Sequence, residues 1–160
     1  MGFTQAVKTC LRKTFVLSGR APRSEYWWFV LFYVLYFFVA GALAFFVTQA
    51  AGGLTLSSGI VLVILGVPAI WFYVAAIFAS VRRLHDRGFS GWWIGASIII
   101  GFLPSVLQLS FSSGALLAVV TIASFVLSIA ILVMTILRGT PGPNKFGEDP
   151  LGYIDEDVFA

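Results

Sequence analysis

The chain has 160 residues, of which 59% are hydrophobic and 11% are charged, and its formal net charge is +3. A soluble domain typically carries about 25% charged residues, so this composition excludes an ordinary soluble globular protein. Two long stretches, residues 26–81 and 88–137, contain no Asp, Glu, Lys or Arg. Because a helix needs about 20 apolar residues to cross the hydrocarbon core, each stretch has room for two membrane spans.

The N-terminal segment predicts a short amphipathic helix over about residues 3–16. Its apolar side chains recur at three- and four-residue spacing, while Lys8, Arg12 and Lys13 fall largely on the other side. Such a helix is suited to lie along the membrane surface, with its cations near anionic headgroups. The alternative is a short helix packed on the central loop of the protein.

The two charge-free stretches predict an all-α integral membrane protein of two helical hairpins. The spans are expected at about 26–49, 59–81, 92–110 and 114–137. Turn-forming residues separate the members of each pair, at AGGLTLSS (51–58) and SFSSG (110–114). Barrel strands alternate polar and apolar residues, and these runs do not. A re-entrant pair over 92–137 stays open, because Gly101, Pro104 and Gly114 interrupt that region.

Aromatic residues and prolines mark particular depths along these spans. Aromatics of the kind found at headgroup depth open the first and third spans: Tyr26, Trp27, Trp28, Trp92 and Trp93. Pro68 and Pro104 lie inside spans, and neither can donate to the carbonyl four residues earlier, at Ile64 and Ile100. We therefore expect both helices to kink, with neighbouring groups satisfying the freed carbonyls.

The distribution of positive charge predicts the topology. Lysines and arginines precede the first span, lie between the second and third, and follow the fourth. The other two connections, 51–58 and 110–113, carry no charge. Cytoplasmic loops are the Lys/Arg-rich ones, so both termini and the central loop are predicted to be cytoplasmic.

Candidate chemistry is confined to the polar segments, and above all to RRLHDRGFSGWW (82–93). The pair His85-Asp86 suggests catalysis, but one histidine and one cysteine cannot build a metal site, and no nucleophile-elbow context surrounds the pair. We predict no catalytic residue, no metal and no cofactor. Nucleic-acid binding is not expected either, because the basic residues are close to the membrane.

The arginines indicate a different role. Guanidinium groups bind carboxylates and phosphates in bidentate fashion, and anionic lipid phosphates lie at the same depth. We therefore expect a cytoplasmic cap that binds anionic lipid or a partner protein. Its expected residues are Arg20, Arg23, Glu25, Arg82, Arg83, His85, Asp86 and Arg87.

Three polar stretches together resemble a known family. They are GRAPRSEYWWF, RRLHDRGFSGWW and GTPGPNKFGEDP, in this order and separated by apolar hairpins. Over about residues 11–152 the chain resembles the bacterial inner-membrane family called domain of unknown function 805 (YhaH-like). The resemblance implies a small multi-pass protein of the bacterial inner membrane, and it implies no particular activity.

All three stretches fall on the predicted cytoplasmic side, which adds Asn144 to the cap. Three contacts are expected: Asp86 with Arg20 or Arg23, Glu25 with Arg82, Arg83 or Arg87, and a turn at Asn144 that closes the cap. Residues 1–152 are expected to form one membrane domain, followed by a flexible acidic tail at 153–160.

Two alternative functions remain open. One is a small oligomeric channel or transporter component that uses Pro68 and Pro104 as bends around a polar cavity. The less favoured one is a membrane enzyme that acts on lipid headgroups with His85 and Asp86. A second copy of the chain or another membrane protein is a possible partner in either case.

Overall fold

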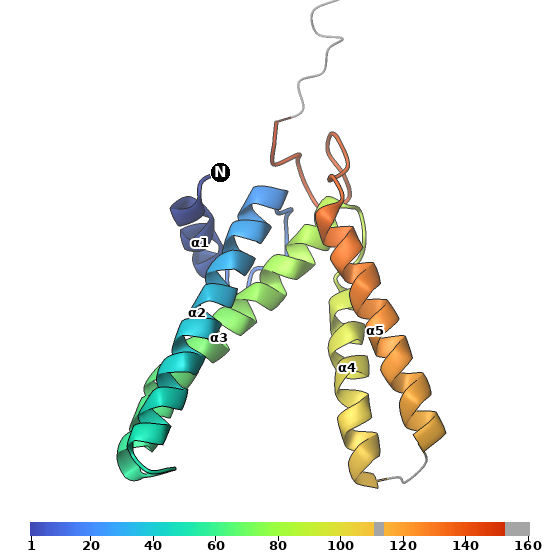
Figure 1. Ribbon diagram of the computed structural model, residues 1–160. Coiled ribbons are helices and arrows are strands. Elements are labelled where there is room, and N and C mark those ends of the chain that lie inside the picture. The colour runs from blue at the N-terminus through green and yellow to red at the C-terminus, as the bar shows by residue number, and fades with distance from the viewer. Residues whose placement is uncertain (111–113, 153–160) are drawn as a thin grey trace, which may run out of the picture. The chain divides into compact units, whose positions relative to one another are not determined.

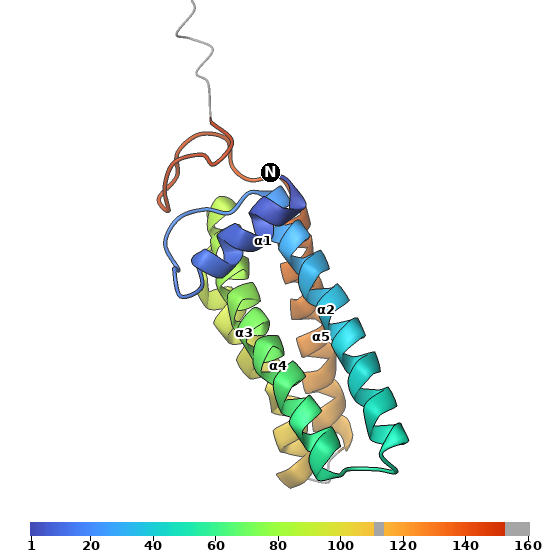
Figure 2. The ribbon, with the colours of Figure 1, turned by 90° about the vertical axis from the view of Figure 1, so that its left-hand side faces the viewer.

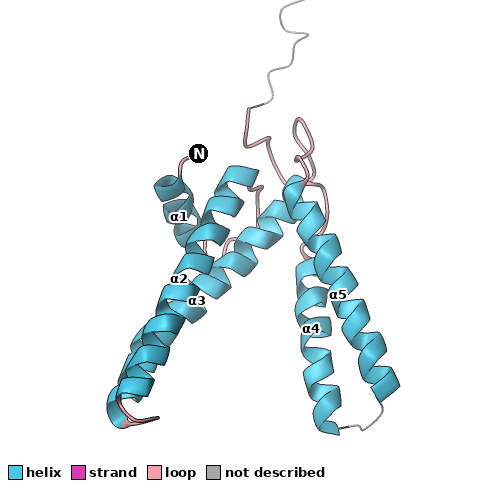
Figure 3. Cartoon of the chain, in the orientation of Figure 1, coloured by secondary structure: helices cyan, strands magenta, loops and turns pink. Residues whose placement is uncertain are grey.

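The computed structural model describes residues 1–110 and 114–152, and within this part the protein is helical (Figures 1 and 3). The helices are α1 (Phe3–Arg12), α2 (Arg23–Ala50), α3 (Leu56–Asp86), α4 (Trp92–Ser110) and α5 (Gly114–Ile136). An isolated bridge between Asn144 and Gly147 is the one β-type pairing among these residues. The all-α prediction is therefore confirmed, and the predicted acidic tail at 153–160 lies outside the described residues.

Each predicted span corresponds to an apolar helix. By length and composition α2, α3 and α5 can each cross a membrane, while α4 is a shorter apolar helix. The charge-free stretches thus become two pairs of apolar helices, with bounds close to those expected.

Helix α1 is shorter than predicted, because it ends at Arg12 rather than near residue 16. The hydroxyl of Thr14 contacts the carbonyls of Cys10 and Leu11, at 3.3 and 2.9 Å, a local side-chain bond to the last turn of α1. Phe15 then adopts a φ of +72°, in the left-handed region that ends helices. The apolar periodicity continues past the end of the helix, which is why it overestimates the length.

The turn between α2 and α3 has the structure that its residues favour. Gly52, at φ +71°, follows α2, and the N–H of Gly53 donates to the Thr48 carbonyl at 2.9 Å, as in a Schellman motif. Thr55 and Ser58 then form a reciprocal cap at the start of α3, each backbone N–H donating to the other's hydroxyl. The predicted turn is confirmed, although it is shorter than the expected 51–58 because α3 begins at Leu56.

The chain divides into two compact units, each described by itself. The first unit comprises residues 1–16 and 24–79, and in it α1 packs across α2 and α3 (Figure 2). Its core is built from small side chains and one large ring, namely Ala6, Cys10, Phe29, Ala75 and Ala79. The small residues let the short helix approach the two long ones closely.

The second unit comprises residues 17–23 and 80–160, and in it α4 packs along α5. Pro104 lies inside α4 and leaves the Ile100 carbonyl without its helical donor. The hydroxyl of Ser124 on α5 lies 3.0 Å from that carbonyl and 2.8 Å from the Val120 carbonyl of its own helix, so the two carbonyls share its one proton. The predicted satisfaction of a freed carbonyl by a neighbour is therefore confirmed here.

Pro68 likewise lies inside α3, in the first unit. The hydroxyl of Tyr36 on α2 donates at 2.7 Å to the carbonyl of Leu65, one residue beyond the predicted Ile64 carbonyl. Rings of the two helices also meet, with Phe32 and Tyr36 both packed on Phe72. The helices run through both prolines, and the kinks themselves stay a prediction.

Candidate functional site: a buried arginine–aspartate clasp

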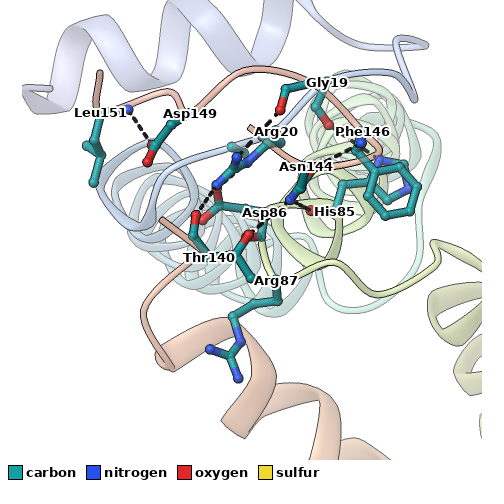
Figure 4. A network of polar contacts seen from close by, with 12 residues as sticks. Gly19, Arg20, His85, Asp86, Arg87, Thr140, Asn144, Phe146, Asp149 and Leu151 are labelled. Carbon is teal, nitrogen blue, oxygen red and sulfur yellow. Dashed lines mark hydrogen bonds and ion pairs between the residues drawn. The ribbon is translucent and has the colours of Figure 1, made fainter. Parts of the chain in front are cut away.

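Three segments of the second unit meet around one carboxylate (Figure 4). The Arg20 Nε lies 2.9 Å from Oδ1 of Asp86, and Nη1 of Arg83 pairs with Oδ2 of the same residue. The Asp86 side chain is 5% exposed, and those of Arg20 and Arg83 are 1% and 0% exposed. We call these three residues the clasp. Of the two arginines expected to pair with Asp86, Arg20 is the one that does so.

The remaining nitrogens of both guanidinium groups donate to backbone carbonyls. Arg20 donates to Gly142 and Thr140, each at 2.5 Å, beyond the end of α5. Arg83 donates to the carbonyl of Thr135 in the last turn of α5, at 3.0 Å, and to that of Leu137, the residue after the helix. A cation at this helix end is also favoured by the helix dipole. The two clasp arginines are therefore satisfied inside the protein.

Electrostatics make Asp86 the group on which the clasp depends. Arg83 lies in the last turn of α3, beyond the apolar segment 59–81. Burial lowers the pKa of its guanidinium, and the carboxylate of Asp86 raises it again. Two buried cations share this one carboxylate, so its removal would leave both without a counter-charge.

The carboxyl end of α3 is closed by residues far apart in the sequence. The carbonyl of Arg82 accepts from the N–H of Ala21 at 3.0 Å, and that of Asp86 accepts from the N–H of Thr140 at 2.9 Å. Gly88, at φ +77°, completes a Schellman motif in which the N–H of Phe89 donates to Leu84. The sequence GFSG is thus the turn that ends α3.

Asn144 closes the clasp as predicted. Its Nδ2 donates to the His85 carbonyl and to the Thr140 hydroxyl, both at 3.0 Å, while its Oδ1 accepts from the N–H of Phe146 at 2.8 Å. Asp149 fastens the same loop, because its carboxylate accepts from the N–H of Gly142 at 3.1 Å. The loop after α5 is therefore held to the end of α3.

His85 is enclosed by this loop. It is 8% exposed and stacks on the Phe146 ring, with 3.9 Å between centroids and 3° between planes. Its Nδ1 lies 3.3 Å from the carbonyl of Gly19. Burial lowers the pKa of His85, which favours the neutral imidazole. An enzyme acting on headgroups would need this ring in an open cleft, and here Phe146 covers it.

Several residues of the site were not among the predicted ones, and in the C-terminal loop they include Gly139, Thr140, Phe146 and Asp149. A Cβ on Gly139 would lie 2.0 Å from Oδ2 of Asp86, so only glycine allows the chain to pass there. The stretch GTPGPNKFGEDP gave a signal for this loop as a whole. It gave none for the individual contacts, which depend on the position of α3.

The other predicted cap residues have varied environments. Arg23 is exposed, Glu25 and Arg82 are buried, and Nη1 of Arg87 donates to the Arg138 carbonyl at 2.6 Å. The pairing of Glu25 with an arginine stays a prediction.

Of the predicted interfacial aromatics, Trp28, Trp92 and Trp93 are exposed, and Tyr26 and Trp27 are half-buried.

Among the described residues, no group of three or more His, Cys, Asp or Glu side chains could hold a metal ion.

Long apolar helices, with a polar clasp at the ends of α3 and α5, define a small helical membrane protein. The chain belongs to the family described as "Protein of unknown function (DUF805)", whose model matches residues 14–148. The family resemblance drawn from the three polar stretches is thereby confirmed.

The chain is similar to two inner-membrane proteins of Escherichia coli (strain K12). It is 33% identical to inner membrane protein YhaH over 133 residues, which cover 82% of this chain and 84% of YhaH. It is 29% identical to inner membrane protein YhaI over 133 residues, covering 83% and 84% of the two chains. No solved structure matches significantly.

Proposed function

We propose that the chain is a four-span inner-membrane protein with both termini and the central loop in the cytoplasm, and that its cap binds anionic lipid. The clasp supports the topology. It joins residues 19–21, 82–86 and 135–147 by hydrogen bonds, and groups bonded to one another lie on one side of a membrane. The chain between each pair of these segments must then cross the bilayer an even number of times.

The length of α4 fits this proposal. Its 19 residues extend about 28 Å at 1.5 Å per residue, close to the roughly 30 Å of the hydrocarbon core. α5 then returns to the clasp with 23 residues. The clasp segments lie in Lys/Arg-rich stretches of the sequence, whereas the connections 51–58 and 110–113 are uncharged, and this bias supports the cytoplasmic location of the clasp.

Two arginines at the rim of the clasp are the groups that we assign to lipid. Arg20 and Arg83 are satisfied internally, whereas neither Arg87 nor Arg138 has a carboxylate partner among the described residues. Arg87 is directed away from the clasp (Figure 4) and donates to the backbone of Arg138, which is exposed. Guanidinium groups bind phosphate well, and the exposed Trp92 and Trp93 follow closely in sequence. This contact between Arg87 and Arg138 carries the proposal.

Native mass spectrometry of the purified full-length protein tests the lipid site. The double variant Arg87→Gln/Arg138→Gln should retain several-fold less phosphatidylglycerol than the wild type, with retention of phosphatidylcholine unchanged. Lys145→Gln is the matched control, because it removes a cation at the tip of the C-terminal loop, where Lys145 lies over the Phe146 ring. An equal loss in that control would contradict a specific site.

Cysteine accessibility in intact cells tests the topology. In a Cys10→Ser background, a membrane-impermeant maleimide should label Leu54→Cys from outside and should label Ser90→Cys only after the membrane is permeabilised. Labelling of Ser90→Cys in intact cells would overturn the proposed orientation.

The alternative functions are a channel or transporter component and an enzyme acting on lipid headgroups. No specific observation favours either one. Ser124 already occupies the carbonyl that Pro104 frees, and His85 lies beneath Phe146. Association with a second copy or another membrane protein remains an expectation.

A further inference from the structure

The first unit carries an amphipathic element that the clasp does not use. One side of α1 is buried against α2 and α3 through Ala6 and Cys10, both 0% exposed. Lys8 and Arg12 lie on the exposed side of the helix. Helix α1 therefore packs on α2 and α3 with one side, and its cations lie on the opposite, exposed side.

The turn after α1 presents apolar side chains instead. Phe15 is 63% exposed and Val16 is 39% exposed. Phe15 nevertheless has a defined position, because its ring packs edge-on against Trp71 and Phe78 of α3, at 5.5 and 5.4 Å between centroids. The rest of the ring faces outward from the protein.

The two ring contacts determine how deep Phe15 lies. Phe78 and Trp71 precede Arg82, the first charged residue of α3, by four and eleven positions. At 1.5 Å per residue these positions lie about 6 and about 16 Å along the helix from that charge. Half of a hydrocarbon core is about 15 Å. A side chain packed between them lies below the headgroups when α3 spans the bilayer.

The backbone conformation of Phe15 indicates that the surrounding residues hold its ring in this position. Its φ of +72° is the one positive value at a non-glycine residue in the described chain. A bulky residue in this region costs of order 1–3 kcal/mol and persists only where its surroundings require it. An ordinary exposed turn would favour glycine or asparagine here.

We propose that α1 and the turn after it form an in-plane anchor, which inserts Phe15 and Val16 into one leaflet and rests Lys8 and Arg12 on anionic headgroups. The occupant of this surface is the lipid bilayer itself. Apolar side chains at hydrocarbon depth lie beside cations, and this combination matches an anionic leaflet rather than a protein groove. The inference rests on the proposed function only for the identity of the leaflet, which would be the cytoplasmic one.

Nitroxide accessibility in nanodiscs tests the anchor on the full-length chain. Spin labels are placed at Phe15→Cys and, as the matched position, at Arg12→Cys, each in the Cys10→Ser background. The ratio of collisions with oxygen to collisions with a water-soluble nickel chelate should be several-fold higher at position 15. Equal ratios at the two positions would overturn the anchor. Both faces of a nanodisc are open to the chelate, so this result is independent of the topology.

Charge reversal tests the headgroup contact. In nanodiscs that contain phosphatidylglycerol, Lys8→Glu/Arg12→Glu should lower the collision ratio at position 15 toward its value in pure phosphatidylcholine. An unchanged ratio would overturn the contact with anionic lipid.

Phe15→Gly serves as a folding control, because it relieves the backbone strain and removes only the ring. This variant should keep the thermal stability of the wild type, and a collapse of stability would mean that the ring is a core residue rather than an anchor.

Discussion

At the scale of single residues, the clasp depends on one carboxylate that serves two buried guanidinium groups. Buried ion pairs contribute little net stability compared with apolar packing, but removing one partner is strongly destabilising. Removing Asp86 would take the partner from two buried cations, because Arg20 and Arg83 both pair with it. The clasp therefore tolerates loss at its centre less well than loss at its rim.

Replacing Asp86 with Asn should lower the free energy of unfolding by about 3–5 kcal/mol, since both arginines would remain buried without a counter-charge. Thermal unfolding in detergent measures the change. Glu148→Gln makes the same chemical substitution at an exposed position of the same unit and should have little effect. Similar losses in the two variants would show that Asp86 has no special role.

Gly139 allows the chain to pass the Asp86 carboxylate, and alanine there should be destabilising. The added Cβ would lie 2.0 Å from Oδ2, and the carboxylate cannot move without breaking its pairs with the two arginines. Overpacking of this kind costs about 1–3 kcal/mol. Gly59→Ala is the control in the same assay. It adds a Cβ to open space within α3, so it should stabilise by about 0.5–1 kcal/mol. A neutral Gly139→Ala would contradict the close approach.

The burial of His85 predicts that the clasp weakens in acid. Because burial lowers the pKa of His85 in the folded state, the unfolded chain takes up the proton first as the pH falls. The stability contributed by neutral His85 is therefore present above about pH 6.5 and is lost below it. Lys145, the charged residue that faces the ring, acts in the same direction as burial.

Melting temperatures measured between about pH 7.5 and about pH 5 test this dependence before most carboxylates titrate. The His85→Gln variant should show a smaller fall across this range than the wild type. Equal slopes would mean that another group is responsible.

At the scale of helices, the α4–α5 pair shows how an apolar helix accommodates proline. Pro104 removes a backbone donor, and the Ser124 hydroxyl lies within hydrogen-bonding distance of the Ile100 carbonyl that is freed. Proline identified the carbonyl in advance from the sequence alone. The donor was not predictable, because it depends on the register of α4 against α5.

Ser124→Ala should destabilise the protein by about 0.6–2 kcal/mol, the range of hydrogen bonds between membrane helices. Ser128→Ala is the control, because that hydroxyl donates within its own helix, to the carbonyl of Ser124. Pro104→Ala restores a backbone N–H for Ile100, so it should make Ser124→Ala nearly harmless. Additive effects in this double-mutant cycle would contradict the bond.

At the scale of the whole molecule, local patterns and long-range contacts differ in how well the sequence reveals them. Charge-free stretches, turn residues and helix-breaking glycines act locally, so the apolar helices and the turns after α2 and α3 could be predicted closely. The predicted turn at 110–114 lies mostly outside the described residues. A pair of Asp86 with Arg20 or Arg23 was expected because the proposed topology leaves few partners for a cation on one side of a membrane, and Arg20 makes it. Contacts of Arg83 with Thr135 and Leu137 could not be foreseen, because they join helix ends that are distant in sequence.

The same long-range contacts predict what the C-terminal segment does for the folded chain. Residues 139–147 supply two of the carbonyls that Arg20 uses, the Thr140 N–H on Asp86 and the Asn144 amide on His85. Without this loop, Arg20 would be left with Asp86 alone, and the last carbonyls of α3 would lose donors. Unpaired buried groups each cost about 1–3 kcal/mol. A chain that ends at Arg138 should therefore accumulate at much lower levels in the membrane and should unfold at lower temperature.

A chain that ends at Gly152 provides the comparison, because every described clasp contact is retained. This truncation should match the full-length protein in membrane abundance and melting temperature, even though it removes most of the acidic residues of the tail. If the two truncations were equally stable, the loop would be an appendage rather than part of the clasp. If only the longer one is stable, the loop is part of what joins the end of α3 to the end of α5, in addition to the contacts of Arg83 with Thr135 and Leu137.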